Sequence, residues 1–164
     1  MAFLGFCKIA EAKGDSKRKG HEDEFELLRF EHKVTQPVTL SGSGRGALTV
    51  SQSNHGEFYL VKEQDPASAP LLKFASNGFH IPEVKVTLCR QAGDQVIDYM
   101  MYEFKDCIVA SFESMGDITG DGLPEEKVGI AYAQIKVTHT ASDSTGKPLG
   151  KTTAEYKRTT GESA

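Results

Sequence analysis

The chain lacks the excess of basic residues that a nucleic-acid partner requires. Its 164 residues include 19 Lys and Arg against 23 Asp and Glu, which gives a formal charge of −4. Phosphate binding needs a clustered basic surface. The one basic run, Lys17–Lys19, is followed almost directly by the acidic run Glu22–Glu24. Such mixed charge is typical of a solvated loop, so no nucleic-acid partner is expected.

Cysteine is scarce as well. The chain has three cysteines, an odd number, and none of them forms a C-x-x-C pair. All three fall in apolar, strand-like runs: Cys7, Cys89 and Cys107. This pattern does not fit a disulfide framework. Small buried thiols in a reducing compartment are the expected state.

Long apolar runs are missing too. The opening "MAFLGFCKIA" is too short to span a membrane, and its basic residues follow the apolar run instead of preceding it, unlike a secretory signal peptide. We therefore expect synthesis in the cytoplasm without membrane insertion. Any export to the extracellular space or a target cell would use a route without a cleavable signal peptide.

What the chain does contain is a series of short strand patterns separated by Gly, Asp and Pro turns. The predicted strands are Phe3–Ile9, Glu24–Val34, Glu57–Glu63, Glu83–Arg90, Val96–Phe104 running into Cys107–Phe112, Lys127–Thr138 and Thr152–Arg158. The clearest hairpin turns at Gly93-Asp94. Such spacing indicates a mainly β, compact antiparallel barrel or sandwich of two packed sheets. We expect a single domain over residues 1–164, in which the tail 139–164 is the least clearly patterned part.

Two local patterns depart from simple alternation. Residues 68–77 read as one short α-helix, in which Ser68 caps the start and Pro70 lies in the first turn, before a left-handed stop at Asn77-Gly78. In "EFELLRFEHKV" the apolar parity changes between Leu27 and Leu28. A bulge there, or a strand that leaves one packed surface for another, would produce this shift.

Candidate chemical motifs are weak. "DITGDGLPEEK" resembles a calcium loop, but position 12 from Asp117 is Val128 where a bidentate Glu is required, and a loop before a strand explains it better. "GSGRG" (Gly42–Gly46) lacks a following helix, so a loop is favoured over a phosphate site. The histidines never occur at ligand spacing, and no catalytic constellation is evident. We expect no enzyme activity, cofactor or metal, and a binding or structural role.

Three blocks of sequence, in order, resemble the haemolysin-coregulated protein (Hcp) family of type VI secretion. They are "FCKIAEAKGDSKRKGHEDEFELLRF", "DPASAPLLKFASNGFHIPEVKVTLCRQAG" and "YMMYEFKDCIVASFESMGDITGDGLPEEKVGIAYAQIKV", which together cover most of the chain from about Phe3 to Val137. The matching positions are Lys8, Ile9, Lys13, Gly14, Asp15, Ser16, His21, Glu24, Phe25, Leu27, Leu28, Gly78, His80, Arg90, Ala92, Gly93, Tyr99, Asp106, Val109, Ser111, Glu126 and Ala133. The chain departs from the family in having no Trp in the strand "RFEHKVTQP", a Gly-rich loop reduced to "SGSGRG", and a divergent tail.

The resemblance implies a β-barrel with one helix at its side, whose subunits form closed hexameric rings that stack into a tube. A contractile sheath drives the tube and its spike protein out of the cell, and small effector proteins travel in the lumen. The family match implies that Glu31, with Arg29, faces the lumen. The loop from Pro37 to Gly56, with Gly42, Gly44, Arg45 and Gly46, is the expected ring-stacking contact. The alternatives are a solitary β-sandwich module that binds a small ligand or sugar and, ranked last, an enzyme.

Overall fold

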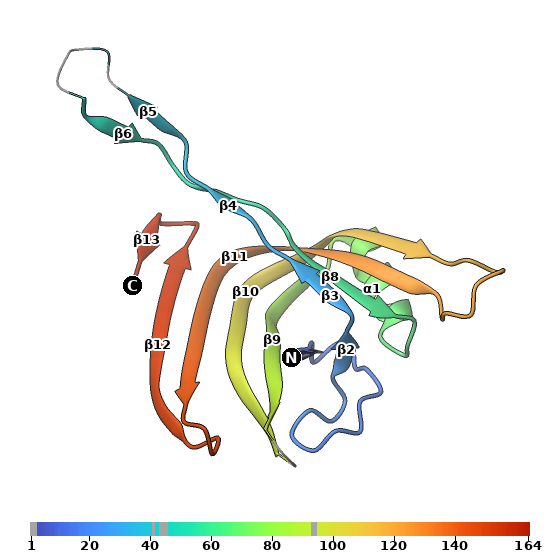
Figure 1. The fold of residues 1–164 in the computed structure, drawn as a ribbon. Helices are drawn as coiled ribbons and strands as arrows, with labels where there is room; N and C mark the ends of the chain where they lie inside the picture. Colours follow the sequence, from blue (N-terminus) through green and yellow to red (C-terminus); the bar gives the residue numbers. More distant parts are fainter. Residues whose placement is uncertain (1–2, 41, 43–45, 93–94) are drawn as a thin grey trace.

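The computed structural model describes residues 3–40, 42, 46–92 and 95–164, and strands dominate it. Figure 1 shows a strongly curved sheet with a helix at its side and a long, thin arm that projects from it. The main sheet comprises β1 (Phe3–Lys8), β2 (Phe25–Leu27), β3 (Arg29–Glu31), β8 (Phe58–Glu63), β9 (His80–Ala92), β10 (Gln95–Met115), β11 (Glu125–Ser142), β12 (Pro148–Lys157) and β13 (Glu162–Ser163). The arm carries β4 (Val34–Thr35), β5 (Val38–Leu40), β6 (Leu48–Val50) and β7 (Asn54–His55). The predicted mainly β, antiparallel class is confirmed.

The main sheet folds over on itself and encloses the core. Its strands pair in the order β13-β12-β11-β10-β9-β1-β2, and β8 connects β11 to β3. Since Leu28 alone separates β2 from β3, the pairing returns to its start but is interrupted there, so the sheet is not closed into a continuous barrel. The buried core includes the aromatic residues Phe25, Phe58 and Phe104, which are fully buried.

The strand that runs through Leu28 changes partner at that residue. β2 pairs with β1, β3 pairs with β8, and the Leu28 amide donates to the Val61 carbonyl at 2.8 Å. Phe25 is fully buried, whereas Leu28 is 51% exposed. The change in apolar parity predicted between Leu27 and Leu28 therefore coincides with the point where the strand leaves one half of the sheet for the other.

The helix α1 (Ser68–Asn77) lies against the sheet, as predicted. Leu71 and Phe74 are its buried residues, and Gly78 ends it in the left-handed conformation (φ 65°), with its amide donating to the Phe74 carbonyl. The predicted role of Ser68 as the cap is wrong, because Ala67 occupies that position. The Ser68 hydroxyl donates instead to a buried carboxylate, Glu126 Oε2, at 2.8 Å.

Several strand boundaries differ from the predicted ones. The predicted strand Glu24–Val34 is divided into β2, β3 and β4, while β10 continues as one strand of 21 residues through Asp106, which has a φ of 50°. β12 begins at Pro148, four residues before the predicted start at Thr152, and pairs with β11. The predicted turn at Gly93-Asp94 lies outside the described residues. No helix in the described part of the chain has the length and apolar character needed to cross a bilayer.

Candidate functional site: the strand switch and the projecting arm

Arg29 and Glu31 lie together on the exposed face of β3, directly after the strand switch. Their side chains are 62% and 53% exposed, and Arg29 Nε lies 3.6 Å from Glu31 Oε1. Lys127 on β11 extends the group, with its Nζ 3.8 Å from Glu31 Oε2 and 4.6 Å from the Tyr59 ring centroid. The structure thus brings the two predicted residues together on an open, mixed-charge surface and adds Lys127, which sequence analysis missed.

The outer part of the arm is a two-stranded ribbon with one apolar face. β5 and β6 pair antiparallel, with Val38 opposite Val50, Thr39 opposite Thr49 and Leu40 opposite Leu48. Because side chains alternate along a strand, the four aliphatic side chains share one face and the two threonines share the other. The aliphatic residues are 53–69% exposed, so this ribbon offers an uncovered apolar surface away from the body (Figure 1).

Two of the four predicted ring-stacking residues, Gly42 and Gly46, lie in the described part of the arm between β5 and β6. Gly42 is exposed, and Gly46 has a φ of 57°, in the region that favours glycine. Gly44 and Arg45 lie outside the described residues. The described part of the predicted loop contains the ladder β5–β6 and the strand β7, which pairs with β4 just before the loop.

The arm joins the body at a cluster of histidine and tyrosine side chains. The Tyr132 hydroxyl lies 2.7 Å from His32 Nε2 and 2.9 Å from His55 Nδ1. The His55 ring stacks on Tyr156, with centroids 4.7 Å apart and planes at 10°. Burial is the first cause of a lowered pKa at His32 and at His55, and it raises the pKa of Tyr132 to about 12. At neutral pH the three groups are therefore uncharged hydrogen-bonding partners that hold the arm in place.

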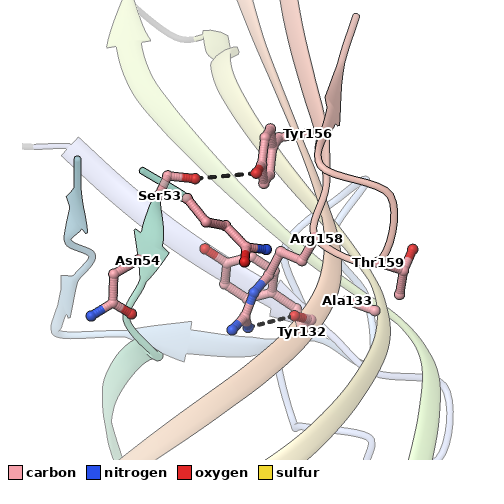
Figure 2. A pocket seen from close by; sticks show the side chains of 8 residues that line it. Ser53, Asn54, Tyr132, Ala133, Tyr156, Arg158 and Thr159 are labelled. Carbon is pink, nitrogen blue, oxygen red and sulfur yellow. Dashed lines mark hydrogen bonds between the residues drawn. The ribbon is translucent and has the colours of Figure 1, made fainter. Parts of the chain in front are cut away.

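A cavity of about 540 Å³ opens beside this cluster (Figure 2). Its lining residues are Gln52, Ser53, Asn54, Tyr132, Ala133, Tyr156, Arg158 and Thr159. Arg158 donates to the Tyr132 carbonyl at 2.8 Å, and the Ser53 hydroxyl donates to Tyr156 at 3.2 Å. The Ser53 bond attaches the segment before β7 to β12, and the Arg158 bond ties the residue after β12 to β11. The cavity is therefore a polar hollow at the root of the arm.

The calcium-like segment forms a turn of its own. The Asp117 carboxylate accepts hydrogen bonds from the Thr119 hydroxyl and amide, at 2.7 and 2.9 Å, and these bonds lower the pKa of Asp117. The segment forms the connection between β10 and β11.

Sequence analysis missed the cluster at the arm root because its members lie far apart in the chain. His32 and Tyr132 are 100 positions apart, and His55 and Tyr132 are 77 apart. The available signal was weaker: His32 precedes the predicted ring-stacking loop Pro37–Gly56, and His55 lies at its end.

Comparison with known proteins shows that the sequence matches a protein family. The sequence model of the family described as "Type VI secretion system effector, Hcp" matches residues 6–139. Protein hcp1 of Pseudomonas aeruginosa is 29% identical over 150 residues, which cover 92% of this chain and 91% of that protein.

Solved structures agree over the whole chain. A structure of a type six secretion system protein superposes with a TM-score of 0.92 at 26% identity, covering 99% of this chain and all of the other. The crystal structure of Hcp1 from Salmonella typhimurium gives a TM-score of 0.81 at 26% identity, with both chains covered completely. The similarity thus includes the arm and the tail as well as the segments that carry the sequence motifs.

Proposed function

This chain belongs to the Hcp family of type VI secretion proteins, and from that premise we propose how its surfaces build and use a secretion tube. It is a secreted, structural component of the type VI secretion system, and its family implies a ring-forming subunit of the tube. The match of the family model to residues 6–139 is the observation that carries this conclusion. The alternative, a solitary β-sandwich that binds a small ligand, is not favoured.

The proposed ring is hexameric and closed, and the arm makes the contact between stacked rings. In a ring of identical chains each subunit contacts its neighbours through two different, complementary surfaces. The arm is suited to a contact along the tube, because its aliphatic face (Val38, Leu40, Leu48 and Val50) stays exposed in the single chain. Burying such a face against another subunit removes apolar surface from water, which favours association.

The proposed lumen surface includes Arg29 and Glu31. Both side chains are open to solvent on a sheet face that carries charge of both signs, together with Lys127. A hydrophilic wall suits a channel that carries small effector proteins without holding them tightly. The contractile sheath and the spike protein are the further partners that we infer from the family.

The experiment that tests the ring is light scattering of the purified chain, combined with negative-stain images. We expect a mass of about six chains and annular particles that stack at high concentration. A strict monomer at high concentration would favour the solitary binding module instead.

Variants separate stacking from ring closure. Deleting Gly42–Gly46, or introducing Leu40→Glu with Leu48→Glu, should abolish tubes and leave single rings, because charges on the ribbon oppose burial of its apolar face. Leu72→Glu is the matched control, since Leu72 is a similarly exposed leucine (52%) on α1, away from the arm. Tubes that form normally after the arm changes would refute the proposed stacking contact.

A further inference from the structure

Three metal-ligand side chains that are distant in sequence meet at the edge of the core, away from the arm. His21 comes from the loop after β1, Cys89 from β9 and Asp98 from β10. Cys89 and Asp98 face each other in the β9–β10 ladder, which shifts register between Asp98 and Met100. Such irregularities redirect side chains next to sites, and here the register shifts by one residue directly after Asp98.

The separations between the three ligand atoms are close to those of a zinc site. A tetrahedral zinc ion with ordinary Zn–N, Zn–S and Zn–O bonds holds its ligand atoms about 3.4–3.6 Å apart. His21 Nε2 lies 3.3 Å from Asp98 Oδ1 and 3.5 Å from Cys89 Sγ, while Cys89 Sγ lies 3.0 Å from Asp98 Oδ1. Only the last separation must widen, by about half an ångström, and the half-exposed Asp98 side chain has room to move.

The histidine is held in the orientation that a metal ligand needs. Its other ring nitrogen, Nδ1, lies 2.9 Å from Glu24 Oε2, and the Glu24 side chain is only 9% exposed. The ring also stacks on Phe6, with centroids 4.3 Å apart and planes at 9°. A carboxylate behind the imidazole is the usual support of a zinc-binding histidine, because it fixes the tautomer and the ring orientation. It directs the Nε2 lone pair toward Cys89 and Asp98.

We propose that His21, Cys89 and Asp98 bind a divalent cation of the zinc type, with Glu24 as the positioning residue. Imidazole, thiolate and carboxylate together suit zinc, whereas calcium and magnesium prefer oxygen ligands alone. The cation would enter from the side of Asp98, whose side chain is 50% exposed, and a water molecule would complete its coordination there.

Charge balance supports the proposal. The thiolate of Cys89 and the carboxylates of Asp98 and Glu24 supply three negative charges, and the cation with the guanidinium of Arg18, which lies over the Phe6 ring at 5.8 Å, supplies three positive ones. On binding, Sγ, Nε2 and Oδ1 replace waters of the hydrated ion, and the thiol proton passes to the buffer. No electrons are transferred.

The competing interpretation is a plain hydrogen-bond chain. Burial, together with the bond to Asp98, raises the pKa of the Cys89 thiol, so without a cation the thiol donates to Asp98. A hydrogen-bond chain alone predicts no specific metal binding, whereas the proposed site does. Metal titration therefore distinguishes the two interpretations.

The experiment titrates the metal-free full-length protein with cobalt(II), a coloured substitute for zinc. We expect a single equivalent to bind, with a thiolate-to-cobalt charge-transfer band that zinc then abolishes. Cys89→Ala should lose the band, and His21→Gln and Asp98→Asn should each weaken binding more than about tenfold. Cys107→Ala, which removes another fully buried thiol, should keep both the band and the affinity.

A second measurement guards against variants that fail to fold. Zinc should raise the melting temperature of the unchanged protein and of Asp106→Asn, since ligands that bind the folded state stabilise it. Asp106 is the matched control for Asp98, because it also pairs with a histidine, His80, but does so at the exposed surface and outside the proposed site. Zinc should leave the melting temperature of Cys89→Ala unchanged, and at the same zinc concentration it should raise that of Asp98→Asn less than that of the unchanged protein. A charge-transfer band that remains in Cys89→Ala, an unchanged metal affinity in Asp98→Asn, or absence of the band in the unchanged protein would each overturn the site.

Discussion

At the scale of single residues, the least replaceable group is a buried ion pair beneath α1. Lys62 Nζ lies 3.1 Å from Glu126 Oε2, and their side chains are only 1% and 2% exposed. Lys62 also pairs with Asp65 at 2.7 Å, and Ser68 donates to the same Glu126 oxygen. One lysine thus pairs with a carboxylate of β11 and with one of the loop before α1, and it ties the start of the helix to the sheet.

Lys62→Ala should therefore destabilise the protein by about 3–5 kcal/mol, because it leaves buried carboxylates without a counter-charge. Urea unfolding measures this loss. Lys13→Ala is the control, since it removes an ion pair whose side chains are 67% and 61% exposed and should cost about 0–1 kcal/mol. Lys62→Met combined with Glu126→Gln should lose less than the two single changes added together. Strict additivity would mean that the two charges do not act as a pair.

The histidines at the arm root should make stability depend on pH. Burial is the first cause of the lowered pKa of His32 and His55, so both rings favour the folded state while neutral. Their contribution is complete above the unfolded value of about 6.5 and is lost as the pH falls from there through the lowered folded-state pKa values. The free energy of unfolding should therefore drop between pH 7.5 and acidic pH, and less steeply in His32→Gln with His55→Gln. His139→Gln, at an exposed position, should follow the unchanged protein; an equally steep drop in the double variant would contradict the assignment.

Such residue-level chemistry was only partly predictable. Glu126 could be singled out because it matches a family position, yet its partner Lys62 is 64 positions away and carries no motif. His21 also matches a family position, but the strand register that places Cys89 opposite Asp98 exists only in the folded sheet. Side-chain clusters depend on which strands pair and in what register, and the order of residues does not specify this by itself.

At the scale of elements, prediction succeeded where local geometry decides the outcome. The bounds 68–77 of α1 follow from its turn residues and apolar spacing, and the parity change at Leu27–Leu28 marked the strand switch. Prediction from the sequence missed the short strands of the arm, β5 and β6. Their side chains are exposed on both faces, so the sequence shows no burial pattern there.

The end of α1 gives a local test. Gly78→Ala should cost about 1 kcal/mol, because its left-handed φ of 65° is unfavourable for any residue with a Cβ. The added methyl group would meet no atom within 4 Å, so the effect isolates the backbone conformation. Thermal or urea unfolding measures it, with Ser76→Ala on the exposed helix face as the control. No loss of stability in Gly78→Ala would show that the helix ends differently in solution.

The arm ribbon should become ordered on assembly. An isolated two-stranded ribbon is marginally stable in water. Among the described residues, β5 and β6 pair only with each other, and their aliphatic side chains are exposed. We expect the amides of Val38–Leu40 and Leu48–Val50 to exchange rapidly in dissociated chains and at least about tenfold more slowly in tubes, because stacking blocks local opening. Hydrogen exchange with mass spectrometry measures this change. The buried strand segment Val84–Leu88 should be protected in both states, and an arm that exchanges equally fast in both would contradict its role in stacking.

At the scale of the whole molecule, the fold class followed from turn spacing, and the family followed from three ordered blocks of matching residues. The way the sheet folds over on itself could not be predicted. It depends on β11 pairing with β12 along one half of its length and with β8 along the other half. The same fold-over separates a buried interior from the charged outer face of β3. Which way that face points in an assembled tube is decided by contacts between chains.

Chemical labelling can determine that direction for Glu31. The native thiols of Cys7, Cys89 and Cys107 are fully buried, so Glu31→Cys introduces an accessible thiol at a defined place. If Glu31 lines the lumen as proposed, a small maleimide should label it in tubes and in dissociated chains. A maleimide attached to a large polymer should label dissociated chains readily and tubes far more slowly, because the polymer cannot enter a narrow channel. Gel shifts measure both reactions, and Lys73→Cys on the exposed face of α1 is the control. Equal labelling of Glu31→Cys by the large reagent in both states would place this face outside the lumen.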